Sequence, residues 1–195
     1  MFSKETYITR RAELKKLTES GLILIFGNND SPANYPANAY KFRQDSTFLY
    51  FFGWQRDGLV GVIDVDNDRE YFVGDEIDID DIVWYGSVTS VGEMAARAGV
   101  ARTAKMRELQ NIIDAAKSSG QEIHFLPPYR FDTKIQIMDL LGLHPAVQKE
   151  AASRKLIDAV VKLRSTKSEE EIAELERAAR IGYEMHTAAM RLCSP

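Results

Sequence analysis

The run Leu22–Phe26 constrains the fold more than any other segment of this chain. All of its residues are apolar, and Gly21 and Gly27 bound it on either side. A strand with one solvated face alternates apolar and polar residues, whereas a strand that is buried on both faces reads as a continuous apolar run. The segment therefore predicts an interior strand of a sheet that is covered by helices on both faces.

The rest of the chain alternates between strand and helix signals. Leu59–Val65 and Glu70–Val73 predict a hairpin, and Glu122–Leu126 predicts a further strand. Helices are predicted between capping residues and glycines, from Ser3 to Gly21, Ser90 to Ala98, Thr103 to Gly120, Asp132 to Leu141 and Ser153 to Leu163. Together these signals predict an α/β fold with a mixed β-sheet of about five or six strands flanked by helices.

The segment Phe42–Trp54 passes from polar residues to an aromatic run. Because aromatic runs of this kind are typical of strands, Thr47–Phe52 is predicted as a second central strand beside Leu22–Phe26. We interpret Arg43, Gln44 and Asp45 as structural residues. Arginine–carboxylate and amide hydrogen bonds would then fix the start of the strand.

Composition excludes several classes of protein. With 195 residues, 45% of them hydrophobic, the chain is predicted to be globular and not disordered. A net charge of −4 and the lack of a Lys/Arg block argue against a nucleic-acid partner. No apolar run approaches the roughly 18 residues of a membrane span, so no membrane partner is expected. The single cysteine, Cys193, fits a reducing, cytoplasmic location.

The last part of the chain predicts a long amphipathic helix. Ser168 and Glu171 have the spacing of a capping box. Apolar and small residues then follow along one side, at Ile172, Leu175, Ala179, Gly182, Met185 and Met190. Such a helix needs an apolar partner. It can fold back on the preceding domain, or it can belong to a following domain that is absent from this chain.

Three segments, in this order, resemble motifs of one family. Residues 42–54 resemble a signature of the N-terminal domains of Xaa-Pro aminopeptidases and prolidases, the creatinase-like N-terminal domain. Trp84-Tyr85-Gly86 matches a short second motif, and Lys162–Ile172 resembles the start of the family's pita-bread catalytic domain. The resemblance implies a creatinase-like domain over residues 1–163. Residues 164–195 would be the linker and first helix of the pita-bread metallopeptidase domain, which this chain lacks.

The resemblance also implies a function. The chain would be the non-catalytic N-terminal domain of a metal-dependent Xaa-Pro aminopeptidase or dipeptidase, which releases residues that precede proline. The domain would serve oligomerisation and help to shape the substrate cleft. Its implied partners are its own catalytic domain, neighbouring subunits of a homodimer or tetramer, and proline-containing peptides.

The family's two divalent metal ions, expected to be manganese, are held by two Asp, one His and two Glu of the catalytic domain. None of the motifs that carry those ligands occurs in residues 1–195. No catalytic residue and no metal ligand is therefore assigned here, and the chain by itself is expected to be inactive. The alternative function is an N-terminal binding module of a catalytically inactive creatinase-like protein.

By its match to the short motif, Trp84 is the candidate substrate-binding residue. In some bacterial aminopeptidases P that tryptophan helps to line the active-site cleft of a neighbouring subunit. An indole offers a rigid apolar face to a proline ring. The alternative is that Trp84 belongs to the core. The family's acidic residue before the Arg-Gln segment is replaced here by Ala37 and Asn38, so an amine-binding role is not carried over.

Neither the two acidic segments nor the histidines have the pattern of a metal site. Asp64, Asp66 and Asp68 resemble the start of a calcium loop, but Arg69 replaces the required glycine, so a polar hairpin turn is predicted. The segment from Asp75 to Asp81 is predicted to be a solvated acidic loop. The histidines share no ligand spacing, and the one in the apolar strand is predicted to belong to the core; they are His124, His144 and His186.

Overall fold

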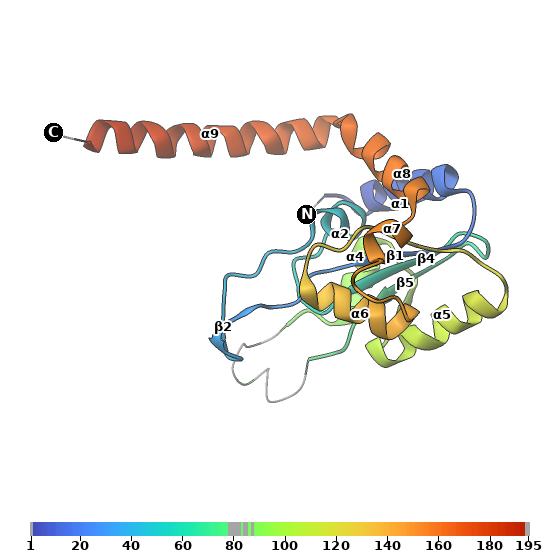
Figure 1. The fold of residues 1–195 in the computed structure, drawn as a ribbon. Helices are drawn as coiled ribbons and strands as arrows, with labels where there is room; N and C mark the ends of the chain where they lie inside the picture. The colour runs from blue at the N-terminus through green and yellow to red at the C-terminus, as the bar shows by residue number, and fades with distance from the viewer. Residues whose placement is uncertain (1, 78–82, 84–85, 87, 194–195) are drawn as a thin grey trace.

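The computed structural model describes residues 2–77, 83, 86 and 88–193. A five-stranded sheet lies at the centre, helices cover it, and one long helix extends away from it (Figure 1). The strand order is β6-β5-β4-β1-β7. The strands are β1 (Leu22–Phe26), β4 (Val60–Asp64), β5 (Arg69–Val73), β6 (Arg102–Ala104) and β7 (Ile123–Phe125).

The sheet is mixed, as predicted. Strand β4 runs antiparallel to β1 and β5, whereas β1 and β7 are parallel, as are β5 and β6. The predicted hairpin is β4–β5. A separate small hairpin, β2 (Pro32–Tyr35) with β3 (Asn38–Ala39), lies within the long loop that follows β1.

Strand β1 is interior and buried on both faces, which confirms the opening prediction. It pairs with β4 on one side and with β7 on the other. Ile23 and Ile25 enter one hydrophobic cluster, while Leu22 and Leu24 enter another. All four side chains are at most 2% exposed. The continuous apolar run therefore reflects two different cores that meet at one strand.

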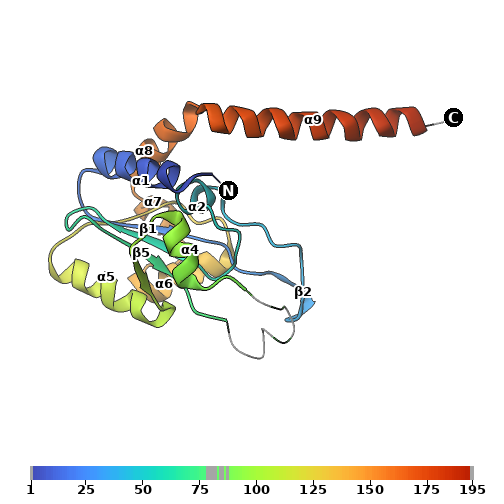
Figure 2. The ribbon, with the colours of Figure 1, turned by 180° about the vertical axis from the view of Figure 1, so that it is seen from behind.

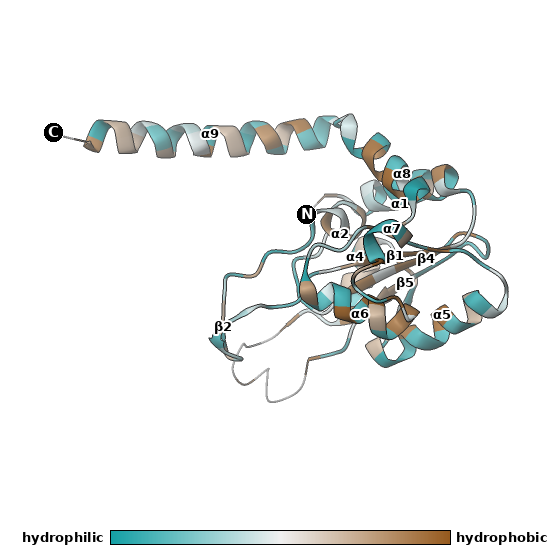
Figure 3. Ribbon diagram, viewed as in Figure 1, coloured by the Kyte–Doolittle hydropathy of each residue, from teal (hydrophilic) through white to brown (hydrophobic). Residues whose placement is uncertain are grey.

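Helices cover both faces of the sheet (Figures 1 and 2). One face packs against α1 (Lys4–Thr18), α2 (Ser46–Phe52), α4 (Val91–Ala98) and α8 (Arg154–Ser165). The other packs against α5 (Leu109–Ser118) and α6 (Phe131–Leu141). Colouring by hydropathy shows apolar stretches on the strands and on parts of the helices around them (Figure 3). The 3-10 turn η1 (Met106–Glu108) precedes α5, and α7 (Gln148–Ala151) precedes α8.

The prediction that Thr47–Phe52 is a central strand was wrong, because this segment forms helix α2. The Asp45 side chain accepts hydrogen bonds from the backbone N–H groups of Thr47 at 2.8 Å and Phe48 at 3.0 Å. Gly53 ends the helix in the left-handed conformation, with φ of 75°. These two caps override the strand preference of an aromatic run. Helical spacing then buries Phe48, Phe51 and Phe52 against the sheet.

One glycine is needed for this packing. Gly61 lies in β4 on the face that carries α2, and a Cβ atom there would collide with the ring of Phe52. The missing side chain allows the Phe52 ring to lie directly on the sheet. Phe52 also stacks on Phe48, with ring centroids 5.2 Å apart.

The prediction of a helix from Thr103 was also wrong at its start. Thr103 lies in β6 and pairs with Phe72 of the neighbouring strand. The helix begins later, where the Glu108 carboxylate accepts a hydrogen bond from the Lys105 N–H at 2.7 Å. The other helices start and end close to the predicted residues. Helix α4, for example, has a capping box between Ser90 and Glu93 and ends at Gly99.

Arg11 joins α1 to the rest of the domain. Its side chain is fully buried. Nε donates to Glu70 Oε2 at 2.8 Å, Nη1 to the Phe51 carbonyl at 2.8 Å, and Nη2 to the Gly99 carbonyl at 3.1 Å. Burial lowers the pKa of the guanidinium, and the Glu70 carboxylate opposes that shift. One side chain thus connects α1 with β5 and with the last turns of α2 and α4.

Helix α9 (Glu169–Leu192) extends away from the domain (Figures 1 and 2). The predicted capping box is present, since Ser168 accepts from the Glu171 N–H and Glu171 accepts from the Ser168 N–H. The structure describes all 24 residues of this helix, and none of them is buried. It does not fold back over the sheet. Its large apolar side chains are exposed, among them Leu175 at 55% and Met185 at 61%.

We expect Arg11→Met to destabilise the domain strongly. The variant leaves the Phe51 and Gly99 carbonyls without their donor, and each buried group left unsatisfied costs about 1–3 kcal/mol. Glu70 keeps Lys15 Nζ as a partner at 3.1 Å. The matched control is Arg154→Met, which removes an exposed pair with Asp158 and should leave the free energy of unfolding nearly unchanged. Urea unfolding measures both variants. Equal losses in the two variants would contradict this role of Arg11.

Candidate functional site

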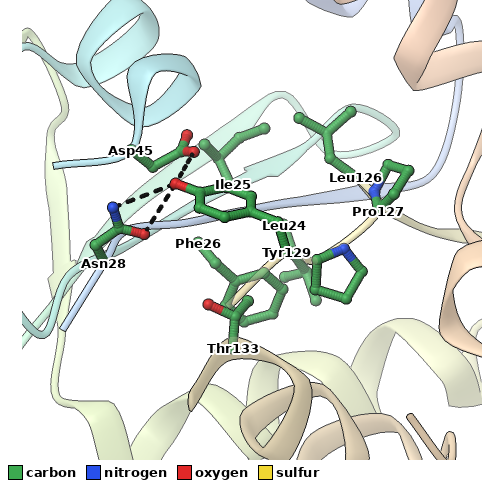
Figure 4. Close-up of a pocket in the computed structure, with 10 residues that line it drawn as sticks. Leu24, Ile25, Phe26, Asn28, Asp45, Leu126, Pro127, Tyr129 and Thr133 are labelled. Atoms are coloured by element: carbon green, nitrogen blue, oxygen red, sulfur yellow. Dashed lines mark hydrogen bonds between the residues drawn. The ribbon is translucent and has the colours of Figure 1, made fainter. Parts of the chain in front are cut away.

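The loops that could carry function converge at one end of the sheet. The carboxyl ends of the parallel strands β1 and β7 lie side by side there, and such ends are where α/β proteins place ligand sites. Asn28 follows β1, and Tyr129 follows β7 after two prolines. Asp45 approaches from the start of α2 (Figure 4).

These three polar side chains contact one another. The Tyr129 hydroxyl donates to Asp45 Oδ2 at 3.1 Å, and Asn28 Nδ2 donates to the hydroxyl oxygen at 3.3 Å (Figure 4). Asn28 Nδ2 donates to the Arg43 carbonyl at 2.9 Å. Burial raises the pKa of the Tyr129 phenol, and Asp45 raises it further, whereas the hydrogen bond with Asn28 lowers it. The phenol therefore stays protonated and donates to the carboxylate.

The cavity beside this group is small. It measures about 40 Å³ and is lined mainly by apolar residues of β1 and of the segment after β7, including Phe26, Leu126 and Pro127. A water molecule needs about 10–15 Å³ of such volume. The cavity therefore has room for a few water molecules and not for a peptide.

Gln44 holds the surrounding loops together. It is 1% exposed, and its Oε1 accepts from the N–H groups of Asn28 at 2.6 Å and Asp45 at 2.8 Å. Its Nε2 donates to the Arg56 carbonyl at 2.5 Å. One amide thus fixes the loop after β1, the start of α2 and the loop before β4.

The interpretation of the Arg-Gln-Asp segment as structural is confirmed for Gln44 and Asp45, which fix the start of a helix and not of a strand. For Arg43 the interpretation was wrong. Its side chain is exposed, and it forms no ion pair with a residue that the structure describes. The segment is therefore held by amide and capping hydrogen bonds instead of an arginine–carboxylate pair.

A larger, acidic cleft lies next to these loops. It measures about 670 Å³. Its walls come from the loops after β1, before β4 and after β5, and its charged residues are Asp30, Arg56, Asp57, Asp75 and Glu76. Among the residues that the structure describes, four carboxylates against one guanidinium give the cleft a negative field, which favours cationic groups.

The carboxylates of the cleft have different roles. Asp75 Oδ1 accepts from the Met106 N–H at 3.1 Å, and Glu76 accepts from the Val91 N–H at 3.0 Å, so both cap helix starts. Burial raises the pKa of Asp30, and the charge of Asp57 raises it further, while Arg130 opposes the shift. Asp30 and Asp57 are therefore two carboxylates that line the same cleft and repel each other.

The candidate substrate-binding residue Trp84 lies outside the described residues. Two residues that flank its segment in the sequence, Ile77 and Val88, line the acidic cleft. The structure therefore leaves the role of Trp84 as a prediction. Most of the acidic run from Asp75 to Asp81 is likewise not described, and its first two residues are exposed, capping carboxylates.

His124 has a structural role, whereas His186 is exposed on α9. His124 is 1% exposed, as predicted for a core histidine. Its Nε2 lies 3.0 Å from the Ser20 carbonyl and its Nδ1 lies 2.7 Å from Ser153 Oγ. Because a carbonyl only accepts, Nε2 carries the proton, and the Ser153 hydroxyl donates to Nδ1. Both ring nitrogens are therefore satisfied inside the protein.

The aspartates of the β4–β5 turn are also engaged, which confirms a polar hairpin. Asp64 accepts from Asn67 and Gln121, Asp66 accepts from Gly21, and Asp68 pairs with Lys15. Within the described ranges, no group of three or more His, Cys, Asp or Glu is placed to hold a metal ion. The described residues therefore do not fit a two-metal site.

The comparison with family models gives one match. The model described as "Aminopeptidase P, N-terminal domain" matches residues 7–124. That range contains β1, β4, β5 and β6, reaches into β7, and includes every residue of the Gln44 network.

The curated relatives that match this chain are Xaa-Pro aminopeptidases. The Xaa-Pro aminopeptidase of Escherichia coli K12 is 25% identical over 201 aligned positions, which cover 99% of this chain and 46% of the relative. A probable Xaa-Pro aminopeptidase of Leptosphaeria maculans is 23% identical over 167 residues. That alignment covers 86% of this chain and 27% of the relative. The chain thus spans less than half the length of these relatives.

Solved structures show the same fold. The low-pH form of E. coli aminopeptidase P superposes with a TM-score of 0.79 at 23% identity, over all of this chain and 46% of that one. The zinc-substituted E. coli enzyme in complex with product gives 0.77 at 22% identity, with the same coverage. None of the described helices is both long and apolar enough to span a membrane.

We expect Gln44→Ala to loosen this end of the sheet. The variant removes the partner of two backbone N–H groups and one carbonyl, and each buried group left unsatisfied costs about 1–3 kcal/mol. Amide hydrogen exchange at Asn28 and Asp45 should accelerate. Gln55→Ala is the control, because Gln55 is exposed and makes one weak bond of 3.4 Å. Unchanged protection at both amides would contradict the role of Gln44.

Proposed function

The chain belongs to the aminopeptidase P N-terminal domain family, and on that premise we propose that it is the non-catalytic N-terminal domain of a metal-dependent Xaa-Pro aminopeptidase or dipeptidase. The observation that carries the proposal is the family match over residues 7–124, together with relatives that extend well beyond this chain. In the proposal, two divalent metal ions, manganese in the cell, are bound by the catalytic domain. The location is cytoplasmic.

We propose a domain boundary after residue 163. Residues 1–163 form the creatinase-like domain, and residues 164–195 form the linker and first helix of the pita-bread domain. The exposed apolar side chains of α9 support it, because an amphipathic helix normally buries its apolar stripe against a partner. The catalytic domain is the partner that the proposal assigns to that stripe.

We further propose that the sheet end with the acidic cleft faces a neighbouring subunit in a homodimer or tetramer. Trp84 would there contribute an apolar face to the cleft that binds proline-containing peptides. The position of Ile77 and Val88 in the wall of the acidic cleft supports this assignment, since they bracket the Trp84 segment in the sequence. The negative cleft would favour a cationic group of the bound peptide.

The charge of that cleft also favours one alternative, a binding module of a catalytically inactive creatinase-like protein. Its four carboxylates would then bind a basic segment of a partner protein. The two functions differ in the residues that follow this domain in the natural protein. A peptidase keeps the two Asp, one His and two Glu that bind the metal ions, and a binding module does not.

We expect the isolated chain to cleave no Xaa-Pro peptide, with or without added manganese or cobalt. The reason is the missing ligand set. The assay follows release of the residue before proline by pure protein. Cleavage that a chelator abolishes would contradict a non-catalytic domain.

In the full-length enzyme, we expect Trp84→Ala to lower kcat/KM for proline peptides without changing the melting temperature. An aromatic contact is worth roughly 0.5–1.5 kcal/mol, which is up to about tenfold in rate. Trp54→Ala is the control. Trp54 packs against the core, and its Nε1 donates to the Met94 carbonyl at 2.8 Å, so its loss should lower stability and leave activity per folded molecule unchanged. A Trp84 variant that behaves like the Trp54 variant would disprove the cleft role.

A further inference from the structure

The first turn of α9 carries the polar contacts between that helix and the sheet domain. Glu170 Oε2 accepts from the Thr6 hydroxyl at 2.9 Å. Glu171 Oε1 lies 3.3 Å from Arg10 Nη2. Both partners belong to α1. Beyond this turn the helix extends into solvent (Figures 1 and 2).

Arg10 is unusual for a residue that faces a helix junction, because it is only 7% exposed. Its guanidinium lies 4.0 Å from the centre of the Tyr50 ring and 4.8 Å from that of Phe2. Nη1 donates to the Tyr50 carbonyl at 2.9 Å. The side chain is therefore held between aromatic rings in one orientation.

The second terminal nitrogen of Arg10 depends on Glu171. Nη2 is buried and forms no hydrogen bond with a described residue, although it lies 3.3 Å from Glu171 Oε1. The contact with the Glu171 carboxylate is thus electrostatic. A buried cation that lost this carboxylate would be left without compensation.

Glu171 in turn fixes the start of the helix. Its Oε2 accepts from the Ser168 N–H at 2.9 Å, while its Oε1 faces Arg10. The same carboxylate therefore caps α9 and contacts α1. Tyr50 extends the junction to α8, because its hydroxyl donates to the Leu163 carbonyl at 3.0 Å.

Space remains on both sides of this contact. A cavity of about 390 Å³ lies between Arg10, Leu49 and Glu174, and another of about 590 Å³ lies between Arg10, Thr9 and Lys167. Close packing does not hold α9 in place on either side. The direction of the helix must then depend on the polar contacts of its first turn.

We propose that Arg10 is a positioning residue that sets the direction of α9 by holding Glu171. The 24-residue helix is about 36 Å long at 1.5 Å per residue, so a tilt of about 10° at its base moves its far end by about 6 Å. Arg10 thereby sets the position of whatever packs on the apolar side of α9.

A distance measurement between two spin labels tests this. Cys193 is the sole cysteine, is exposed and follows α9 directly. The second label is placed by Ala115→Cys on the exposed side of α5. In this background we compare Glu171→Gln, which removes the charge and keeps an acceptor for the Ser168 N–H, with Arg10→Met. Glu174→Gln, one turn further along the same helix, is the matched control.

We expect a narrow distance distribution for the parent and for Glu174→Gln. In Glu171→Gln and Arg10→Met the distribution should widen, or its mean should move, by about 6 Å or more, while circular dichroism shows that α9 stays helical. If the distribution stays narrow in Glu171→Gln, the proposal is overturned. It is also overturned if Glu174→Gln widens the distribution as much, or if Arg10→Met lowers the melting temperature and leaves the distances unchanged.

Discussion

The buried guanidinium of Arg11 is the interaction on which the remaining structure depends. It is the point where α1, β5 and the last turns of α2 and α4 meet, and its three nitrogens all donate to acceptors that these elements supply. A charge at this depth is tolerated only with such partners. One side chain therefore holds α1 and α2 in position. The Gln44 network and the base of α9 both depend on these two helices.

Two neighbouring residues of α1 thus have different roles, although both donate to carbonyls of α2. Arg11 points into the domain and holds the helices on the sheet, whereas Arg10 points to the junction with α9. At the other end of α2, Asp45 and Gln44 order the loops beside the acidic cleft. One short helix consequently connects the helix junction with the candidate functional site, which suits a domain that positions other parts of a larger enzyme.

The sequence predicted those parts of the fold that local pattern decides. The prediction of a strand at Leu22–Phe26 was correct because a continuous apolar run shows burial on both faces. The prediction of the β4–β5 hairpin was correct because its turn residues stand in the sequence. The prediction of a strand at Thr47–Phe52 was wrong because the two helix caps outweighed the strand preference of the aromatic residues.

Tertiary contacts explain the other differences. The helix predicted from Thr103 was wrong at its start because Thr103 pairs with the edge of β5 as part of a strand. No local sequence pattern shows that this edge is free. The contacts of Gln44 with Asn28 and of Arg10 with Glu171 join distant segments, so one sequence could not reveal them. The cap by Asp45 was the exception: an aspartate directly before the run, followed by Gly53, was a signal for a short helix.

The metal content of the full-length protein tests the central claim, that this chain is the metal-free part of a metallopeptidase. Elemental analysis of the purified full-length protein and of this chain, both after dialysis against manganese, is the direct measurement. The account predicts two ions per full-length chain and none bound by residues 1–195. A full-length protein without bound metal, or stoichiometric manganese on this chain alone, would contradict it.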